Sequence, residues 1–169
     1  MRARHRLFAF LILTAAALAS AAAPAEPPLK ADRIVVEKSR HLLTLFSGGR
    51  VLRRYRVALG AGGLGPKRRQ GDARVPEGHY VIDWRNPNSA YHLALHISYP
   101  NAADVVAAAA RGEKPGGDIM IHGLPNGFGI VGGLHRRLDW TAGCIAVTDA
   151  AIEEIWRDVA DGTPIEIRP

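Results

Sequence analysis

The chain has 169 residues, with 22 Lys and Arg against 16 Asp and Glu, which gives a net charge of +6 at pH 7. This length suits a single hydrophobic core. The positive charge is mild and lacks the concentrated basic stripe that nucleic-acid binding requires. One cysteine excludes an intramolecular disulfide. The composition therefore predicts one domain with no nucleic acid among its partners.

The N-terminus has the pattern of a secretory signal peptide. The basic hexapeptide MRARHR precedes the apolar run LFAFLILTAAALA, which is too short to cross a bilayer comfortably. Small residues at Ala19, Ala21 and Ala23 offer cleavage sites of the A-x-A kind. We predict a signal peptide over residues 1–23, and an uncleaved N-terminal anchor is the alternative.

Export determines the environment that we expect for the rest of the chain. Residues 24–31, which include PAEPP, are predicted to form a short linker, and residues 32–169 the folded domain. Loss of three arginines with the signal peptide lowers the net charge from +6 to +3, a mild balance that suits an anionic polymer such as a cell wall. The predicted location is the periplasm or cell-wall space, with no stable membrane span after cleavage.

Strand-forming sequence dominates the predicted domain. Short runs rich in β-branched and aromatic residues recur between turns, and the first three runs read as a meander with a turn at Ser47–Arg50. The Gly-rich, basic segment 60–71 has no periodicity, which predicts a loop. The predicted strands are 32–38, 41–46, 51–60, 75–84, 91–99, 118–123, 143–147 and 163–167.

Two segments have the pattern of short helices. Residues 102–111 are rich in alanine, follow Asn101 as a predicted N-cap and end at a glycine. Residues 149–160 follow Thr148 as a predicted N-cap and carry apolar side chains at helical spacing. The Gly-rich connection 124–140, between the predicted strands 118–123 and 143–147, is expected to be irregular. The predicted fold is mainly β with two short helices, in a single sandwich or barrel.

The single thiol needs an explanation. An unpaired cysteine in an oxidising compartment is either buried and inert or a nucleophile. A cysteine attacks a carbonyl as the thiolate, which requires a base and donors for the oxyanion. His122 ends one predicted strand and Cys144 begins another, so His122 could take the thiol proton if these strands are neighbours. The amides of Gly143 and Cys144 are candidate oxyanion donors, because glycine lets the backbone approach a ligand closely.

The segments IHG and TAGCIAV resemble the His-Gly and Ser-x-Gly-Cys signature of the L,D-transpeptidase (YkuD-type) catalytic domain family. The resemblance extends over nearly the whole predicted domain, including the opening strands and GDARVPEGHYVI. It implies a β-rich cysteine enzyme of peptidoglycan that serves cell wall biogenesis and cell shape, with no cofactor and no metal. Carried over by position, Cys144 would be the nucleophile, His122 the proton acceptor and donor, and the Gly123 carbonyl the group that orients the imidazole.

The resemblance implies a thioester route on tetrapeptide stems of peptidoglycan. The thiolate would attack the peptide bond that follows the L-centre of a diamino acid and release the terminal D-alanine. An amine on a second stem or on a wall-anchored protein would resolve the thioester. Water as acceptor would make the same Cys-His site an L,D-carboxypeptidase or amidase, and the sequence leaves this alternative open. A non-enzymatic wall-binding module is a third alternative.

The motif departs from the family pattern beside the cysteine. Ala142 and Ala146 stand where many relatives have basic residues, and Thr141 replaces the common Ser. The alanines remove side chains that could bind a stem carboxylate. We expect His135, Arg136 and Arg137 in the long connection to supply that positive charge instead.

Three further residues complete the predicted substrate-binding set. Thr141 and Trp140 adjoin the motif, and Trp140 could either contact substrate or pack beneath the strand. His96 could line the same groove. His92 and His96 could face one side of a strand, but no carboxylate or cysteine lies at ligand spacing, so no metal site is predicted.

Overall fold

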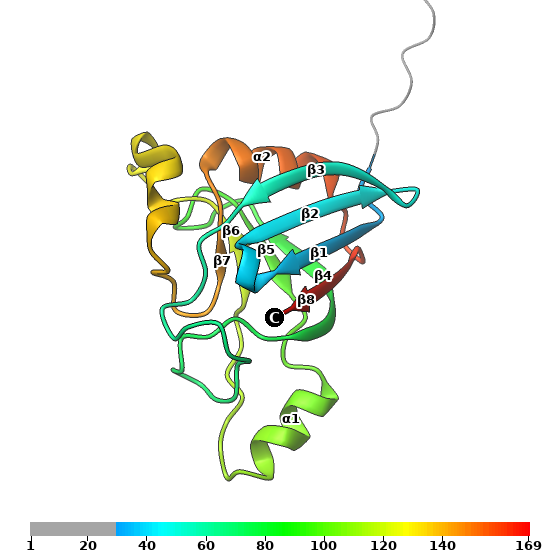
Figure 1. The fold of residues 1–169 in the computed structure, drawn as a ribbon, viewed down its shortest axis with the longest axis vertical. Helices are drawn as coiled ribbons and strands as arrows, with labels where there is room; N and C mark the ends of the chain where they lie inside the picture. Colours follow the sequence, from blue (N-terminus) through cyan, green and yellow to red (C-terminus); the bar gives the residue numbers. More distant parts are fainter. Residues whose placement is uncertain (1–29) are drawn as a thin grey trace, which may run out of the picture.

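The computed structural model describes residues 30–169, which form eight strands, two α-helices and two 3-10 segments (Figure 1). The predicted signal peptide, residues 1–23, and most of the predicted linker lie outside the described residues. The elements in chain order are β1 (Arg33–Glu37), η1 (Lys38–Arg40), β2 (Leu42–Ser47), β3 (Arg50–Arg56), β4 (Gly78–Asn86), β5 (Ala94–Ile97), α1 (Ala102–Ala109), β6 (Met120–His122), η2 (Gly129–Arg137), β7 (Ile145–Ala146), α2 (Asp149–Asp158) and β8 (Pro164–Arg168).

All eight strands belong to one curled sheet with the order β3-β2-β1-β8-β4-β5-β6-β7. The predicted opening meander is confirmed, because β1 pairs with β2 and β2 with β3, both antiparallel. The two edges of the sheet meet where Ala58, just beyond β3, forms an antiparallel bridge with Ala146 of β7. Their backbone amides and carbonyls bond reciprocally at 2.9 Å. This closure fixes β7 from both sides.

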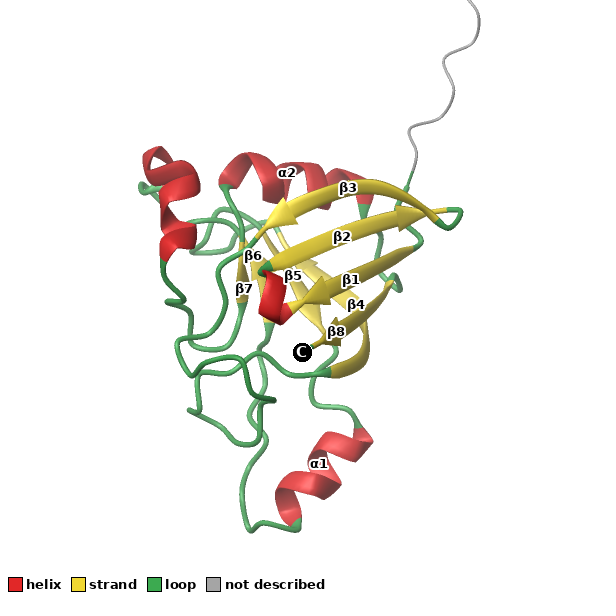
Figure 2. Ribbon diagram, viewed as in Figure 1, coloured by secondary structure: helices red, strands yellow, loops and turns green. Residues whose placement is uncertain are grey.

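The core lies inside the curled sheet. Alternate side chains of paired strands enter it, as the two-residue period of a strand requires. Ile34 and Val36 of β1 lie opposite Ile165 and Ile167 of β8, and all four are at most 2% exposed. Helix α2 covers the sheet beside β3, while α1 projects at the opposite end of the molecule (Figure 2). The predicted mainly β fold with two short α-helices is confirmed.

Both predicted helices begin at their predicted caps. The Asn101 side chain accepts a hydrogen bond from the Asp104 amide, and Asp104 accepts one from the Asn101 amide, which completes a capping box. Thr148 accepts a hydrogen bond from the Ala151 amide at the start of α2. Among residues 30–169, none of the helices has both the length and the hydropathy needed to span a bilayer.

The structure corrects several predicted elements, and two of these corrections concern the segments beside Cys144. The predicted strand 143–147 begins only at Ile145, so Cys144 lies in the turn before β7. The connection 124–140 is not irregular throughout, because it contains η2, in which Gly132 breaks the helical path at φ 51° and ψ −133°. This backbone conformation is accessible to glycine and costly for other residues. Two short turns of 3-10 helix therefore flank Gly132.

Candidate active site

The neighbouring strands β6 and β7 bring the predicted pair of residues to one face of the sheet. They run parallel, with Ile121 opposite Ile145 and His122 opposite Ala146. Ile121 and Ile145 point into the core and are fully buried. Alternation then directs His122 to the other face. Cys144, in the turn two residues before Ala146, lines the same cavity as His122. The pair is offset by two residues along the strands.

The side chains of His122 and Cys144 line a single cavity of about 340 Å³. His122 is 4% exposed, whereas Cys144 is only partly buried. Thus the sulfur adjoins a hollow and is not sealed beneath apolar packing. The other lining residues are Ser89, Tyr91, Ala94, Asp118, Met120, Trp140, Thr141 and Ala142.

A backbone hydrogen bond fixes the tautomer of His122. Its Nδ1 lies 2.7 Å from the carbonyl oxygen of Gly123. A carbonyl only accepts, so Nδ1 carries the proton and Nε2 of the neutral ring is the free acceptor. Burial lowers the pKa of His122, against the opposing effect of the Gly123 carbonyl. The imidazole is therefore a neutral base at pH 7.

The thiol of Cys144 is also held in its neutral form. Burial raises its pKa, a backbone hydrogen bond with Met120 lowers it, and the charge of Asp118 raises it further. The Sγ atom lies 3.6 Å from the Asp118 carbonyl oxygen, within reach of a weak S–H donor. A neutral thiol beside a neutral imidazole suits proton transfer during attack and disfavours a thiolate already present at rest.

The turn before Cys144 depends on a glycine and a threonine. Gly143 has φ 127°, and a Cβ there would lie 2.9 Å from the carbonyl oxygen of Arg74. Its amide donates to Thr141 Oγ1 at 3.2 Å, and Thr141 Oγ1 donates to the Cys144 carbonyl at 2.7 Å. Thr141 is 4% exposed. Although Thr141 lines the cavity, its hydroxyl forms both of its hydrogen bonds within the turn, to Gly143 and Cys144.

The predicted loop 60–71 is confirmed as a loop and packs against this turn. The Ala61 amide donates to the Thr141 carbonyl at 2.9 Å, and the Thr141 amide donates to the Leu59 carbonyl at 3.1 Å. A Cβ on Gly60 would lie only 2.0 Å from the Ala73 carbonyl oxygen. The loop therefore approaches the motif through backbone atoms, which the glycine allows.

Aromatic side chains form the wall around His122. The Tyr91 ring lies 4.5 Å from the imidazole, centroid to centroid, and the Trp140 ring lies 5.9 Å away, edge-on. Trp140 Nε1 donates to His135 Nδ1 at 3.4 Å. Trp140 was predicted to belong to the site and lines its cavity. Tyr91 was not predicted, and no motif in the sequence distinguishes it from the other tyrosines.

The structure does not bring His96 into the cavity. Its ring stacks on Trp84 with 5.0 Å between centroids, and its Nδ1 lies 2.6 Å from a carboxylate oxygen of Asp83. His92 instead bonds Glu153 at 2.8 Å, so the two histidines point to different partners. Across residues 30–169 there is no group of three His, Cys, Asp or Glu placed to hold a metal ion.

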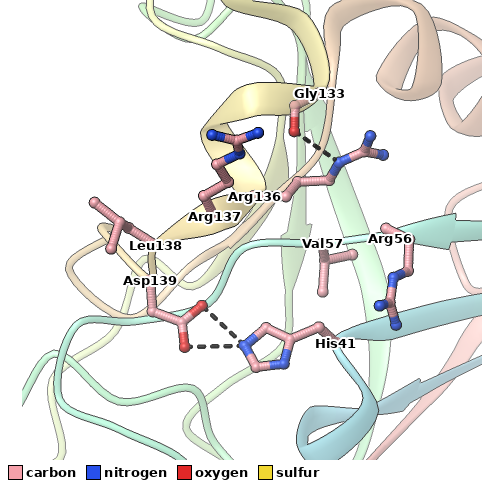
Figure 3. Close-up of a pocket in the computed structure, with 8 residues that line it drawn as sticks. All are labelled: His41, Arg56, Val57, Gly133, Arg136, Arg137, Leu138 and Asp139. Carbon is pink, nitrogen blue, oxygen red and sulfur yellow. Dashed lines mark hydrogen bonds and ion pairs between the residues drawn. The ribbon is translucent and has the colours of Figure 1, made fainter.

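Arg136 and Arg137 line a different cavity, shown in Figure 3. This cavity is larger, at about 510 Å³, but no nucleophile lines it. Its other lining residues are His41, Arg56, Val57, Gly133, Leu138 and Asp139. Both arginines are near the motif along the chain, but they do not line the cavity of Cys144.

Known proteins resemble this chain in sequence and in fold. YafK of Escherichia coli (strain K12), provisionally named an L,D-transpeptidase, is 38% identical over 109 residues, which cover 62% of this chain and 36% of YafK. The structure of Pgp2 from Campylobacter jejuni, a helical cell shape determining protein, aligns with a TM-score of 0.62 at 24% identity, over 83% of this chain and 48% of Pgp2.

A further solved structure, Bdellovibrio bacteriovorus Bd1075, aligns with a TM-score of 0.56 at 27% identity, over 82% of this chain and 48% of Bd1075. This chain thus spans less than half the length of each of these three relatives. The L,D-transpeptidase catalytic domain (YkuD) matches residues 31–167, nearly all of the described chain. The protein therefore belongs to the L,D-transpeptidase catalytic domain family.

Proposed function

We propose that this protein is a peptidoglycan L,D-transpeptidase in which Cys144 is the nucleophile and His122 the general base. The observation that carries the proposal is the cavity that both side chains line, with the imidazole held at Nδ1 by the Gly123 carbonyl. That hydrogen bond leaves Nε2 to accept a proton. Family membership supports peptidoglycan stem peptides as the substrate, and the predicted export supports action in the periplasm or cell-wall space.

The proposed reaction has two steps through a thioester. In the first, His122 Nε2 takes the Sγ proton while sulfur attacks the carbonyl that follows the L-centre of the diamino acid in a tetrapeptide stem. The C–S bond forms, the C–N bond breaks, and His122 passes the proton to the leaving amine of D-alanine. In the second, the amine of another stem or of a wall-anchored protein attacks the thioester, its proton passes through His122, and the thiol is restored.

The same geometry suggests how the oxyanion is stabilised. A tetrahedral intermediate needs hydrogen-bond donors aimed at its oxygen. Because the Gly143 amide already donates to Thr141 Oγ1, we assign the main donor role to the Cys144 amide. Thr141 is then a positioning residue, since its hydroxyl holds the turn between Gly143 and Cys144.

We propose that the stem peptide packs against Tyr91 and Trp140. Both rings line the cavity beside His122 and leave apolar surface open to it. Arg136, Arg137 and His96 have no part in this proposed donor site, because none of them lines the cavity.

The proposal is tested with tetrapeptide muropeptides and the purified protein, using mass spectrometry of both products and enzyme. Transpeptidation predicts released D-alanine, a cross-linked dimer, and a protein mass raised by the acyl group on Cys144. Cys144→Ser keeps nearly the same shape with a weaker nucleophile and should lose the dimer. Cys144→Ala should lose the dimer and the adduct together.

Other outcomes separate the alternatives. Tripeptide without dimer means that water is the acceptor, so the enzyme is an L,D-carboxypeptidase. Unchanged muropeptides with unmodified wild-type protein would overturn the catalytic proposal and leave a wall-binding module.

A further inference from the structure

The connection between β6 and β7 carries a cluster of exposed apolar side chains. Phe128 and Leu134 are both 60% exposed, Leu138 is 75% exposed and Ile130 is 97% exposed. Single exposed apolar residues are ordinary, but a contiguous cluster marks an interaction surface. In Figure 1 the gold segment around η2 projects beyond the sheet. These side chains therefore form a protruding apolar edge.

Two hollows flank this edge and differ in chemistry. One, of about 430 Å³, has an almost wholly apolar lining that includes Phe128, Val131 and Leu134. The other is the cavity of about 510 Å³ in Figure 3, to which Arg56 and Arg136 contribute. Arg137 and Leu138 line both. An apolar surface and a cationic surface are thus continuous around one segment.

The arginines of this surface have no carboxylate partner among residues 30–169. Residues 124–138 contain no Asp or Glu. In the part of the chain that the structure describes, Arg56, Arg136 and Arg137 form no ion pair with a carboxylate. Asp139, the acid that lines the cationic cavity, is occupied by His41 Nε2 at 3.0 Å and by the Leu59 amide at 2.8 Å. The arginines are therefore available to an external anion.

We propose that residues 124–138 dock the domain on an anionic lipid surface. Phe128, Ile130 and Leu134 would enter the boundary between headgroups and acyl chains, and the arginines of the cationic cavity would bind lipid phosphates. Apolar side chains bordered by Lys or Arg are the pattern of interfacial membrane binding. The proposal concerns attachment of the domain and adds to the peptidoglycan chemistry at Cys144 without altering it.

The shape and charge of the surface favour a lipid layer over other occupants. A protruding, almost fully exposed Ile130 fits a medium that can deform around it. A second copy of this chain would bring its own unpaired arginines against these, and like charges repel. The described chain also begins at the end of the long axis from which η2 projects (Figure 1). A membrane at that end would face both features.

The test is sedimentation of the exported protein with vesicles of phosphatidylglycerol and phosphatidylcholine, compared with vesicles of phosphatidylcholine alone. Comparison of each variant with the wild type cancels any contribution of residues 1–29, because these residues are the same in every protein compared. We expect the affinity for anionic vesicles to be well above that for neutral vesicles. The difference should fall as salt is raised, because the Debye length shortens from ~10 Å at 0.1 M to ~3 Å at 1 M. Arg137→Gln should lower affinity for the anionic vesicles about fivefold.

Matched variants separate the two halves of the surface. Ile130→Ser should lower affinity for anionic vesicles by roughly tenfold, through lost apolar burial. Val106→Ser, an exposed apolar change on α1, and Lys114→Gln, an exposed charge change near it, should leave affinity unchanged. Ile130→Ser, Val106→Ser and Lys114→Gln should keep wild-type activity on soluble muropeptides, since none of these three residues lines the cysteine cavity.

Several outcomes would overturn the docking proposal. These are equal affinity for both kinds of vesicle, an equal loss in the two α1-end controls, or dimerisation that Ile130→Ser abolishes. Binding of glycerol 3-phosphate without vesicle binding would indicate a free-anion site, and capture of an acidic peptide instead of vesicles would indicate a protein partner. Cys144→Ala should bind vesicles normally, so a failure of the catalytic proposal is distinguishable from a failure here.

Discussion

Burial sets the charge of both titrating groups in the proposed site. It lowers the pKa of His122 below its ordinary 6.5 and raises the pKa of the Cys144 thiol above its ordinary value. Both shifts favour the neutral form, because each group would have to carry its charge in a poorly hydrated place. The resting enzyme therefore has an uncharged base beside an uncharged nucleophile.

This arrangement predicts the pH dependence of acylation. The rate should rise with pH through a titration below 6.5 and then stay level through neutrality, because only His122 must lose a proton before attack. The measurement is the initial rate of mass gain of the protein with a carbapenem or a tetrapeptide stem. His122→Gln should remove the level region. A wild-type rate that climbs only above about pH 8.5, the value of a free thiol, would exclude His122 as the base.

A second residue-scale prediction concerns Gly143. An alanine there would place its Cβ 2.9 Å from the Arg74 carbonyl oxygen, at a φ of 127° that side chains rarely adopt. The turn would shift and carry the Cys144 amide away from the oxyanion. We expect Gly143→Ala to lower kcat/KM by on the order of 10²-fold, the loss typical of one oxyanion donor. Ala142→Gly, at the exposed neighbouring position, is the control and should stay within a few-fold of wild type.

The individual residues of the site were predictable to different degrees. The motif identified Cys144, His122 and Gly123 as site residues. In the structure Cys144 and His122 line one cavity, and His122 is hydrogen-bonded to the Gly123 carbonyl. Tyr91 reaches His122 only because β5 pairs with β6, a long-range register that no local pattern contains. Arg136, expected to supply positive charge for a stem carboxylate, lines a different cavity from Cys144, since closeness along the chain does not determine the direction in which a 3-10 turn points a side chain.

At the scale of elements, the site depends on two very short strands. β6 has three residues and β7 has two, and only parallel pairing between them sets His122 against Ala146. Such a pair would have little stability alone. It is held by β5 on one side and by the bridge from Ala58 on the other. The catalytic geometry is therefore a property of the closed sheet.

Element types were read correctly from the sequence more often than element ends. The caps of α1 and α2 are local, so Asn101 and Thr148 identified both helix starts. Strand ends depend on where a partner stops bonding. The run 91–99 looks uniformly β-forming, yet β5 is only Ala94–Ile97, because Tyr91 and His92 turn toward the site and toward Glu153. The 3-10 turns of η2 were missed because the glycines in this segment have low helix propensity, so nothing in the sequence indicated a helical structure that tertiary packing imposes.

At the scale of the molecule, the loop after β3 joins the N-terminal meander to the catalytic turn. The fully buried Lys38 binds the Gly65 and Val75 carbonyls at 2.9 and 3.0 Å and Glu77 at 2.8 Å. On the other side the loop bonds to Thr141 through Ala61. Loss of the loop's own structure would therefore loosen both halves of the fold.

Asp72 organises that loop and makes its stability dependent on pH. Burial raises the pKa of Asp72, but hydrogen bonds from the Arg68, Arg69 and Arg74 amides and from Lys67 outweigh it and lower the pKa to about 2. The folded value lies below the ordinary 3.8. The carboxylate's contribution is therefore complete above about pH 4 and is lost as the pH falls through about 2. Its size is about 2 kcal/mol, from the shift alone.

We therefore expect acid to destabilise the wild type partly through Asp72. Asp72→Asn should lower the free energy of unfolding by about 2 kcal/mol at pH 7, measured by urea denaturation, and should flatten its decline between about pH 4 and pH 2. Asp161→Asn is the matched control: its carboxylate is 51% exposed and binds Arg85 at 2.9 Å, so its loss should cost less than about 1 kcal/mol. If the free energy of unfolding of Asp72→Asn fell below pH 4 as steeply as that of the wild type, the acid sensitivity would have to come from another carboxylate. Asp72 would then not be the residue that makes the stability of this loop depend on pH.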